Sequence, residues 1–338
     1  NSFKQALKIK PDYAEAYNNI GNVLQDNGDL ENALESYTKA LEIKPDNAEA
    51  TENLVLLLTS YTPKKESLNL IVIVNKEIQN IDIKNTSDSI SDKQVINLLS
   101  TSLRYLSHYD LRVGTKLFQT YKRNSVDLNC KRHELIFDKH GVIPKFCFGC
   151  YKVQVEPRSI IELIKLYLIF DQLMLKDNNT RKCMVELRPE ISGFYKGLIY
   201  CSGLKQANQI AERLDIILKR SIGPSLSCQV KRGCSEYAIA FPNYKKINNS
   251  GPQLMNYDKE WKVIEEDHDK ENPMLPNENI SPSKSGLNLN DVLIMQKWID
   301  YAKGVGDQQV DLLKQNTICY QDVYGLAKTR LNQFNFNH

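Results

Sequence analysis

A repeat of 34 residues at the start of the chain limits its possible folds more than any other feature. The segment FKQALKIKPDYAEA, which starts at Phe3, returns as YTKALEIKPDNAEA from Tyr37. Identical or similar residues recur at this spacing in the pairs Phe3/Tyr37, Ala6/Ala40, Leu7/Leu41, Ile9/Ile43, Pro11/Pro45 and Ala14/Ala48. A period of this length is typical of helix pairs that stack on one another, because one pair cannot bury its apolar face alone.

The complete unit, residues 14–47, resembles the tetratricopeptide repeat (TPR) at each of its key positions. Its matching residues are Tyr17, Ile20, Gly21 and Leu24 on the first helix, Ala33, Tyr37 and Ala40 on the second, and Pro45 at the end. The resemblance covers residues 1–60 and implies helical hairpins of an α-solenoid. The segment NAEATENLVLLLTSY then predicts a closing helix. Because the chain starts inside a repeat, we expect further repeats before Asn1.

The first helix of this unit carries a polar face. With Tyr17, Ile20 and Leu24 turned inward, the opposite side presents Glu15, Asn18, Asn19, Asn22, Gln25 and Asp26. The stretch AYNNIGN is similar to the TPRs of O-GlcNAc transferase-like superhelices, whose groove asparagines hold an extended peptide backbone. The resemblance implies a protein or peptide partner and a binding groove that includes Glu15, Asn18, Asn19, Asn22 and Asp26. A solvated polar face is the alternative reading.

The composition of the chain shifts after the repeats, and it suggests four parts: residues 1–62 (TPR repeats and closing helix), 63–140 (helical connector), 141–242 (α+β domain) and 243–338 (linker and C-terminal helices). Apolar spacing predicts that residues 60–126 are mainly helical, with Ser91 or Asp92 as a cap. Close to the end of this stretch lies a cluster of basic residues, Lys122, Arg123, Lys131 and Arg132. It is either a solvated face or a contact for phosphate or nucleic acid.

The α+β part shows strand and helix patterns in the order β-α-β-β-α-β, which predicts a ferredoxin-like domain. Its strands are expected in YKVQV, RKCMVELRPE, FYKGLIYCSG and SLSCQVKRGC. The residues predicted to form the core are Val153, Val155, Val185, Leu187 and Val230. The residues predicted on the other face are Lys152, Gln154, Glu156, Glu186, Arg188, Lys196, Gln229 and Lys231. This charged face is either wet or a binding surface. It lacks the aromatic pair of RNA-binding sheets, so we do not expect nucleic acid.

The cysteines leave two readings open. Cys130, His133, Cys147 and Cys150 have a spacing compatible with zinc, C-x2-H-x13-C-x2-C. Cys150, however, runs directly into a strand, where residues three apart point to opposite faces. We therefore expect structural thiols rather than a cofactor or a disulfide. A reactive Cys234, flanked by Lys231 and Arg232, is a weak indication of an enzyme.

Whole-chain properties give no sign of a nucleic-acid-binding or membrane-spanning protein. The net charge of +3 is small, and runs such as LVLLL are too short to span a membrane. Eight cysteines spread over 338 residues suggest a reducing, cytoplasmic location, unless a signal peptide precedes Asn1. In the tail, Trp298 and Tyr301 are expected to be buried on a helix. We predict a TPR-mediated scaffold with an α+β domain of unknown activity; the alternative is an enzyme or zinc domain that modifies a captured protein.

Overall fold

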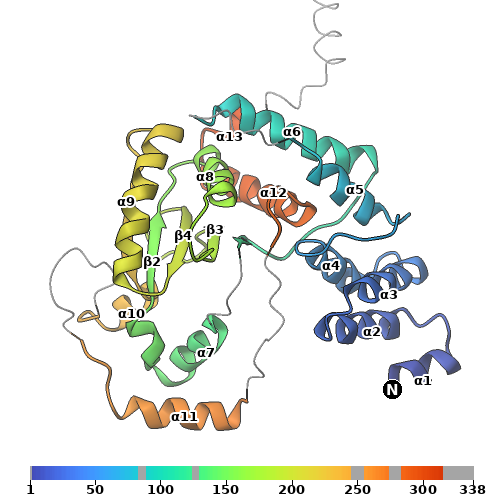
Figure 1. Ribbon diagram of the computed structural model, residues 1–338, viewed down its shortest axis with the longest axis horizontal. Helices are drawn as coiled ribbons and strands as arrows, with labels where there is room; N and C mark the ends of the chain where they lie inside the picture. The colour runs from blue at the N-terminus through green and yellow to red at the C-terminus, as the bar shows by residue number, and fades with distance from the viewer. Residues whose placement is uncertain (1, 83–88, 124–128, 245–254, 274–282, 315–338) are drawn as a thin grey trace, which may run out of the picture.

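The computed structural model describes residues 2–82, 89–123, 129–244, 255–273 and 283–314 (Figure 1). The chain begins with four helices, α1 (Ser2–Ile9), α2 (Ala14–Asp26), α3 (Leu30–Ile43) and α4 (Ala48–Leu57). Helices α2 and α3 form a closely packed hairpin, which the sequence predicts from its repeat. A Cβ atom added at Gly21 would lie 2.4 Å from the Tyr37 ring, so only glycine permits this approach.

The connector contains α5 (Leu70–Gln79) and α6 (Asp92–His108). Ser91 caps α6 through a capping box with Gln94, so the expected cap at this position is confirmed. The expectation of a mainly helical segment from 60 to 126 is wrong in one important place. Residues Gln119–Lys122 form a strand, β1, which pairs with β3 in the central sheet.

One antiparallel sheet organises the second half of the chain. Its strands are β1, β2 (Tyr151–Val155), β3 (Arg181–Val185), β4 (Tyr195–Cys201) and β5 (Cys228–Arg232), in the spatial order β1-β3-β4-β2-β5. Helix α8 (Ile160–Gln172) follows β2, and α9 (Leu204–Ser221) follows β4. The first and last of the four predicted strands, β2 and β5, are antiparallel neighbours.

Helices α8 and α9 cover one face of the sheet (Figure 1). Val153, Val155 and Val185 are buried there, as the alternation predicts, and Val230 is partly buried. The prediction of Leu187 as a core residue is wrong, because β3 ends at Val185 and the Leu187 side chain is 54% exposed. Alternation fixes a facing direction only while the strand continues.

The tail returns to the centre of the molecule. Helix α12 (Leu289–Gly304) contacts α4, α5, α6 and α8 as well as β1 and β3 (Figure 1). Trp298 is buried as predicted, and its Nε1 donates to Phe118 O at 2.8 Å. Tyr301 is partly buried. The short helix α13 (Val310–Lys314) follows, and the helices expected around Val323, Leu326 and Leu331 lie outside the described residues.

A smaller layer lies at one end of the sheet. It comprises α7 (Cys130–His140), the 3-10 turn η1 (Lys145–Phe148), α10 (Ser235–Ala240) and α11 (Trp261–Glu271). Ile143, Cys147, Tyr237 and Tyr244 form its own apolar cluster. In the part of the chain that the structure describes, no helix is both long enough and apolar enough to cross a membrane.

Candidate functional site

An amide cluster joins α2 to α4 on the TPR hairpin; we define it as Asn18, Asn22, Gln25 and Asn53. Asn53 Nδ2 on α4 donates to Asn18 Oδ1 and to Asn22 Oδ1, both at 2.9 Å. The Tyr37 hydroxyl lies 2.9 Å from Asn22 Oδ1 and 3.0 Å from Gln25 Oε1 and shares its one proton between these two acceptors. The acceptor oxygens of α2 therefore face protein donors. Their orientation is fixed by these bonds, which leaves the amide NH2 groups to point elsewhere.

The predicted groove residues do not all join this cluster. Asn18 is only 2% exposed, and it lies beside Asn22 through their shared donor. Glu15 is exposed and pairs with Lys44 at 3.1 Å, while Asp26 is exposed at the end of α2. Asn19 is half-buried. Sequence reasoning missed Asn53, although it lies one repeat period after Asn19.

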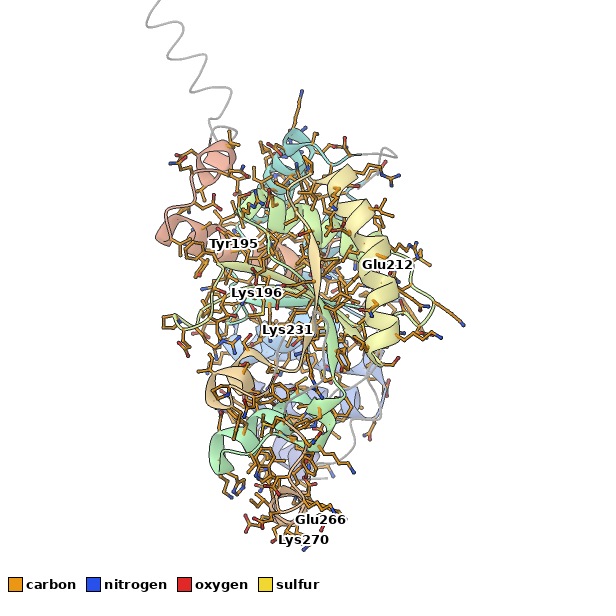
Figure 2. The ribbon with its side chains drawn as sticks, turned by 90° about the vertical axis from the view of Figure 1, so that its left-hand side faces the viewer. Tyr195, Lys196, Glu212, Lys231, Glu266 and Lys270 are labelled. Atoms are coloured by element: carbon orange, nitrogen blue, oxygen red, sulfur yellow. The ribbon has the colours of Figure 1, made fainter. Side chains whose placement is uncertain are left out.

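The predicted polar face of the sheet is buried rather than wet. Lys152 is 3% exposed, Lys231 is 6% exposed and Gln154 is 5% exposed. Figure 2 shows Lys196 and Lys231 on the side of the sheet away from Glu212 of α9. The start of α10 covers part of this face: Cys234 and Ser235 contact Lys152 and Lys231 of the sheet, and Glu236 pairs with Arg188 just after β3. Burial of so many polar groups requires partners within the protein.

Some of these charges pair with one another. Glu186 accepts from Arg188 Nε at 2.7 Å and lies 3.2 Å from Lys196 Nζ. Arg188 also pairs with Glu236 of α10. Burial raises the pKa of Glu186, but the positive charges of Arg188 and Lys196 have the larger effect. The pKa of this carboxyl therefore lies below its ordinary value. Gln154 Nε2 donates to Glu156 Oε1 at 2.7 Å, and Gln229, the last of the predicted residues, is half-buried opposite Gln154 on β5.

A second group on this face surrounds a thiol. Lys152 Nζ donates to Cys234 Sγ at 3.4 Å and lies 5.1 Å from the centre of the Tyr200 ring. Lys231 Nζ donates to Ser235 Oγ at 2.6 Å. Burial raises the pKa of the Cys234 thiol, but the ammonium groups of Lys152, Lys231 and Lys182 outweigh it and hold that pKa below the ordinary value.

The other cysteines at this end behave in the opposite way. Burial raises the pKa of Cys147 to about 12, and it also raises the pKa of Cys150. These thiols are protonated near neutral pH. Cys234 therefore differs from its neighbours because it contacts a lysine directly, whereas they are mainly desolvated.

Two of the four residues considered for zinc, His133 and Cys147, contact aromatic side chains. His133 stacks on Phe146 with ring centres 5.1 Å apart, and Cys147 Sγ lies 3.4 Å from the Tyr237 hydroxyl. Cys130 is exposed at the start of α7. Within the described ranges, no group of three or more histidine, cysteine, aspartate or glutamate side chains is arranged to hold a metal ion. The seven described cysteines are all free thiols.

The predicted cationic cluster of the connector separates in space. Lys122 is buried in the sheet, where its Nζ lies 2.9 Å from Asp291 Oδ2 and 3.5 Å from Asp171 Oδ1. Arg132 instead pairs with Asp269 of α11 at 2.6 Å. These two basic side chains hold helices in place, so they do not form a common phosphate-binding surface.

A comparison with protein families matches residues 14–47 to the tetratricopeptide repeat. The match spans α2 and α3 and ends where α4 begins. No curated protein matches the chain. The family match thus supports the repeat and its general role in protein interaction, and it covers neither the sheet nor the tail.

Proposed function

We propose that this protein is an interaction scaffold whose TPR helices bind an extended peptide across α2 and α4. The observation that carries the proposal is the amide cluster. Asn53 and Tyr37 fix the oxygens of Asn22 and Gln25. The NH2 groups of these two half-buried side chains then donate to the carbonyl groups of a peptide. Such contacts bind the peptide backbone, which is the same in every peptide. They therefore contribute affinity that depends little on the amino-acid sequence of the peptide.

In this proposal, the chain shares with O-GlcNAc transferase-like repeats a groove that binds the backbone of a peptide. Asn18 contributes indirectly, because it is buried and orients Asn53. Glu15, at the start of α2, already pairs with Lys44, whereas Asp26 is exposed at the end of the helix, where it would favour a basic residue in the peptide. Protein partners are therefore expected to bind through an extended, moderately basic segment.

Residues 141–242 are proposed to form a ferredoxin-like domain, with β1 of the connector added at one edge of its sheet. In support, β2, β3, β4 and β5 lie in the order β5-β2-β4-β3, and all neighbours are antiparallel. Helices α8 and α9 follow the first and third of these strands. The abundance of free thiols supports a reducing compartment such as the cytoplasm.

The test is selection of peptides from a random phage-displayed 12-residue library on the immobilised full chain. We expect enrichment of peptides with basic residues, and we expect the variant with both Asn22→Ala and Asn53→Ala to retain them about tenfold less well. The matched control is Asn32→Ala, an exposed amide on α3 that bonds Asp29 at 2.7 Å. Equal retention by all three proteins would refute a role for the amide cluster.

A further inference from the structure

Two lysines on the polar face of the sheet lie on either side of β4 without a carboxylate partner. Lys152 on β2 is opposite Tyr200 of β4, and Lys182 on β3 is opposite Leu198 of the same strand. Because Leu198 and Tyr200 are two residues apart, both lysine side chains leave the same face of the sheet. Among the described residues, no carboxylate forms an ion pair with either ammonium group.

The charge of these two lysines is not balanced within the described part of the chain. The buried carboxylate of this face, Glu186, pairs with Arg188 and Lys196 instead. The contact of Lys152 with Cys234 supplies at most one negative charge, and only when that thiol is ionised. The site therefore retains a net positive charge at a place where water solvates it poorly.

The environment of Lys182 is unfavourable for a positive charge. Lys152 is only 3% exposed, and Lys182 is half-buried. Burial, together with the nearby Lys152 ammonium, lowers the pKa of Lys182 to about 8. A bound anion would offset the repulsion between the two ammonium groups and the loss of their hydration, so this arrangement favours anion binding.

The lysine pair is accessible from the side of β1 and α7. Lys182 Nζ lies 5.6 Å from the centre of the Tyr121 ring, and Tyr121 is 36% exposed. Cys130, the first residue of α7, is also exposed, and it lies within electrostatic range of both lysines. Asn129 makes no side-chain capping bond at this end of α7. The N–H groups of the first helical turn therefore add hydrogen-bond donors close to the lysines.

We propose that Lys152 and Lys182 form a binding site for a phosphate group, with the first turn of α7 as a further source of donors. A phosphate dianion matches the two positive charges, and its oxygen atoms can accept from both ammonium groups at once. The group belongs either to free phosphate or to a phosphate monoester whose substituent rests on the exposed Tyr121 ring. The site lies on the sheet, away from the amide cluster, and the scaffold role does not require it.

The experiment titrates inorganic phosphate into the full chain at pH 7 by calorimetry, with the ionic strength held constant by NaCl. We expect saturable binding by the wild type and an affinity at least about tenfold lower in Lys182→Met and in Lys152→Met. Lys182→Arg retains the charge and should retain binding, which separates loss of the charge from misfolding. The matched control is Lys205→Met, an exposed lysine on α9 on the opposite face, which should change nothing.

A second measurement follows the ammonium group itself. In a chain labelled with 13C at the lysine Cε atoms, the NMR signal of Lys182 is identified by its loss in Lys182→Met. Saturating phosphate should raise the pKa of Lys182 by at least about one pH unit relative to NaCl of the same ionic strength. The same pKa in both salts would mean general screening of charge and would refute the site. An affinity for phosphate that is unchanged in Lys182→Met would refute it as well.

Phenyl phosphate distinguishes the two sources of the phosphate group. Binding about tenfold tighter than that of inorganic phosphate, with the gain lost in Tyr121→Ala, assigns the site to an aromatic phosphate monoester. Equal affinities for the two compounds assign it to free phosphate. Failure of both compounds to bind the wild type overturns the proposal, and it leaves the peptide-binding role of the TPR helices untouched.

Discussion

Lys152 and Val153 are neighbours in β2, yet they belong to two different chemical environments. Val153 lies in the core under α8 and α9, and Lys152 is buried on the opposite face beside Cys234. The alternation of the sequence predicts which residues share a face. It does not predict that the polar face is buried, because the residues that cover it are distant in the sequence. Cys234, which contacts Lys152, lies 82 positions after it.

Substitution by aspartate should have different effects at a core position and at an exposed position of this domain. Val155→Asp should unfold the domain or cost more than about 4 kcal/mol, because it places an unpaired carboxylate in the core. Leu187→Asp should change the free energy of unfolding by less than about 0.5 kcal/mol, since this side chain is exposed. Urea denaturation followed by circular dichroism measures both. Similar losses in the two variants would contradict the assignment of faces.

The lowered pKa of Lys182 should make the free energy of unfolding depend on pH. Burial, together with the nearby Lys152 ammonium, lowers the pKa of Lys182 to about 8. Between this value and the unfolded value of about 10.4, the unfolded chain binds more protons, so stability contributed through this group rises with pH. Lys182→Met should therefore stabilise the protein at pH 7 by about 1 kcal/mol, and the advantage should shrink by pH 10. An advantage that is constant with pH, or absent at pH 7, would contradict this reading.

At the scale of elements, the pattern of the sequence identifies most of the helices and four of the five strands. It fails for β1, because Gln119–Lys122 is only four residues long and follows a helical pattern. What stabilises β1 lies far away in the sequence. Lys122 Nζ contacts Asp291 at 2.9 Å and the carbonyl of Gly286 at 2.7 Å, and the Tyr167 hydroxyl donates to Asp291 at 2.6 Å. This buried network joins β1, α8 and α12.

Loss of one partner in this network should destabilise the sheet strongly. Lys122→Met leaves two buried aspartates without their cation, which should cost about 3–5 kcal/mol. The second substitution Asp291→Asn should recover part of that loss. Lys303→Met removes an exposed pair with Asp300 and should cost less than about 1 kcal/mol. Thermal denaturation compares the four proteins; equal effects at Lys122 and Lys303 would show that the network contributes little.

At the scale of the whole molecule, the repeat is part of a larger packed unit. Helix α4 contacts α12, and the backbone N–H of Lys284 donates to Thr59 O at 3.0 Å. Asn75 on α5 accepts from the backbone of Leu289 at 2.9 Å. The sequence indicates the TPR hairpin from its period, but the packing of the tail on α4 depends on contacts more than 200 residues apart, for which no local pattern exists.

This packing predicts that residues 1–62 are not an independent domain. The isolated fragment exposes the surface of α4 that contacts α12, so its hairpin should melt at a lower temperature than in the full chain. Circular dichroism of the fragment, and hydrogen exchange of α2 and α3 within the full chain, make the comparison. The same stability in both settings would mean that α12 contributes nothing to the repeat.

The central claim is that the TPR amide cluster reads a peptide backbone, and backbone-modified peptides test it most directly. A peptide selected on the full chain is synthesised with its amides and, one position at a time, with an ester in place of an amide, which weakens the carbonyl acceptor. Calorimetry then measures binding to the wild type and to Asn22→Ala. We predict that one ester lowers the affinity of the wild type about tenfold and changes the affinity of Asn22→Ala little, because that variant has already lost the donor. Equal losses in both proteins at every position would contradict the account.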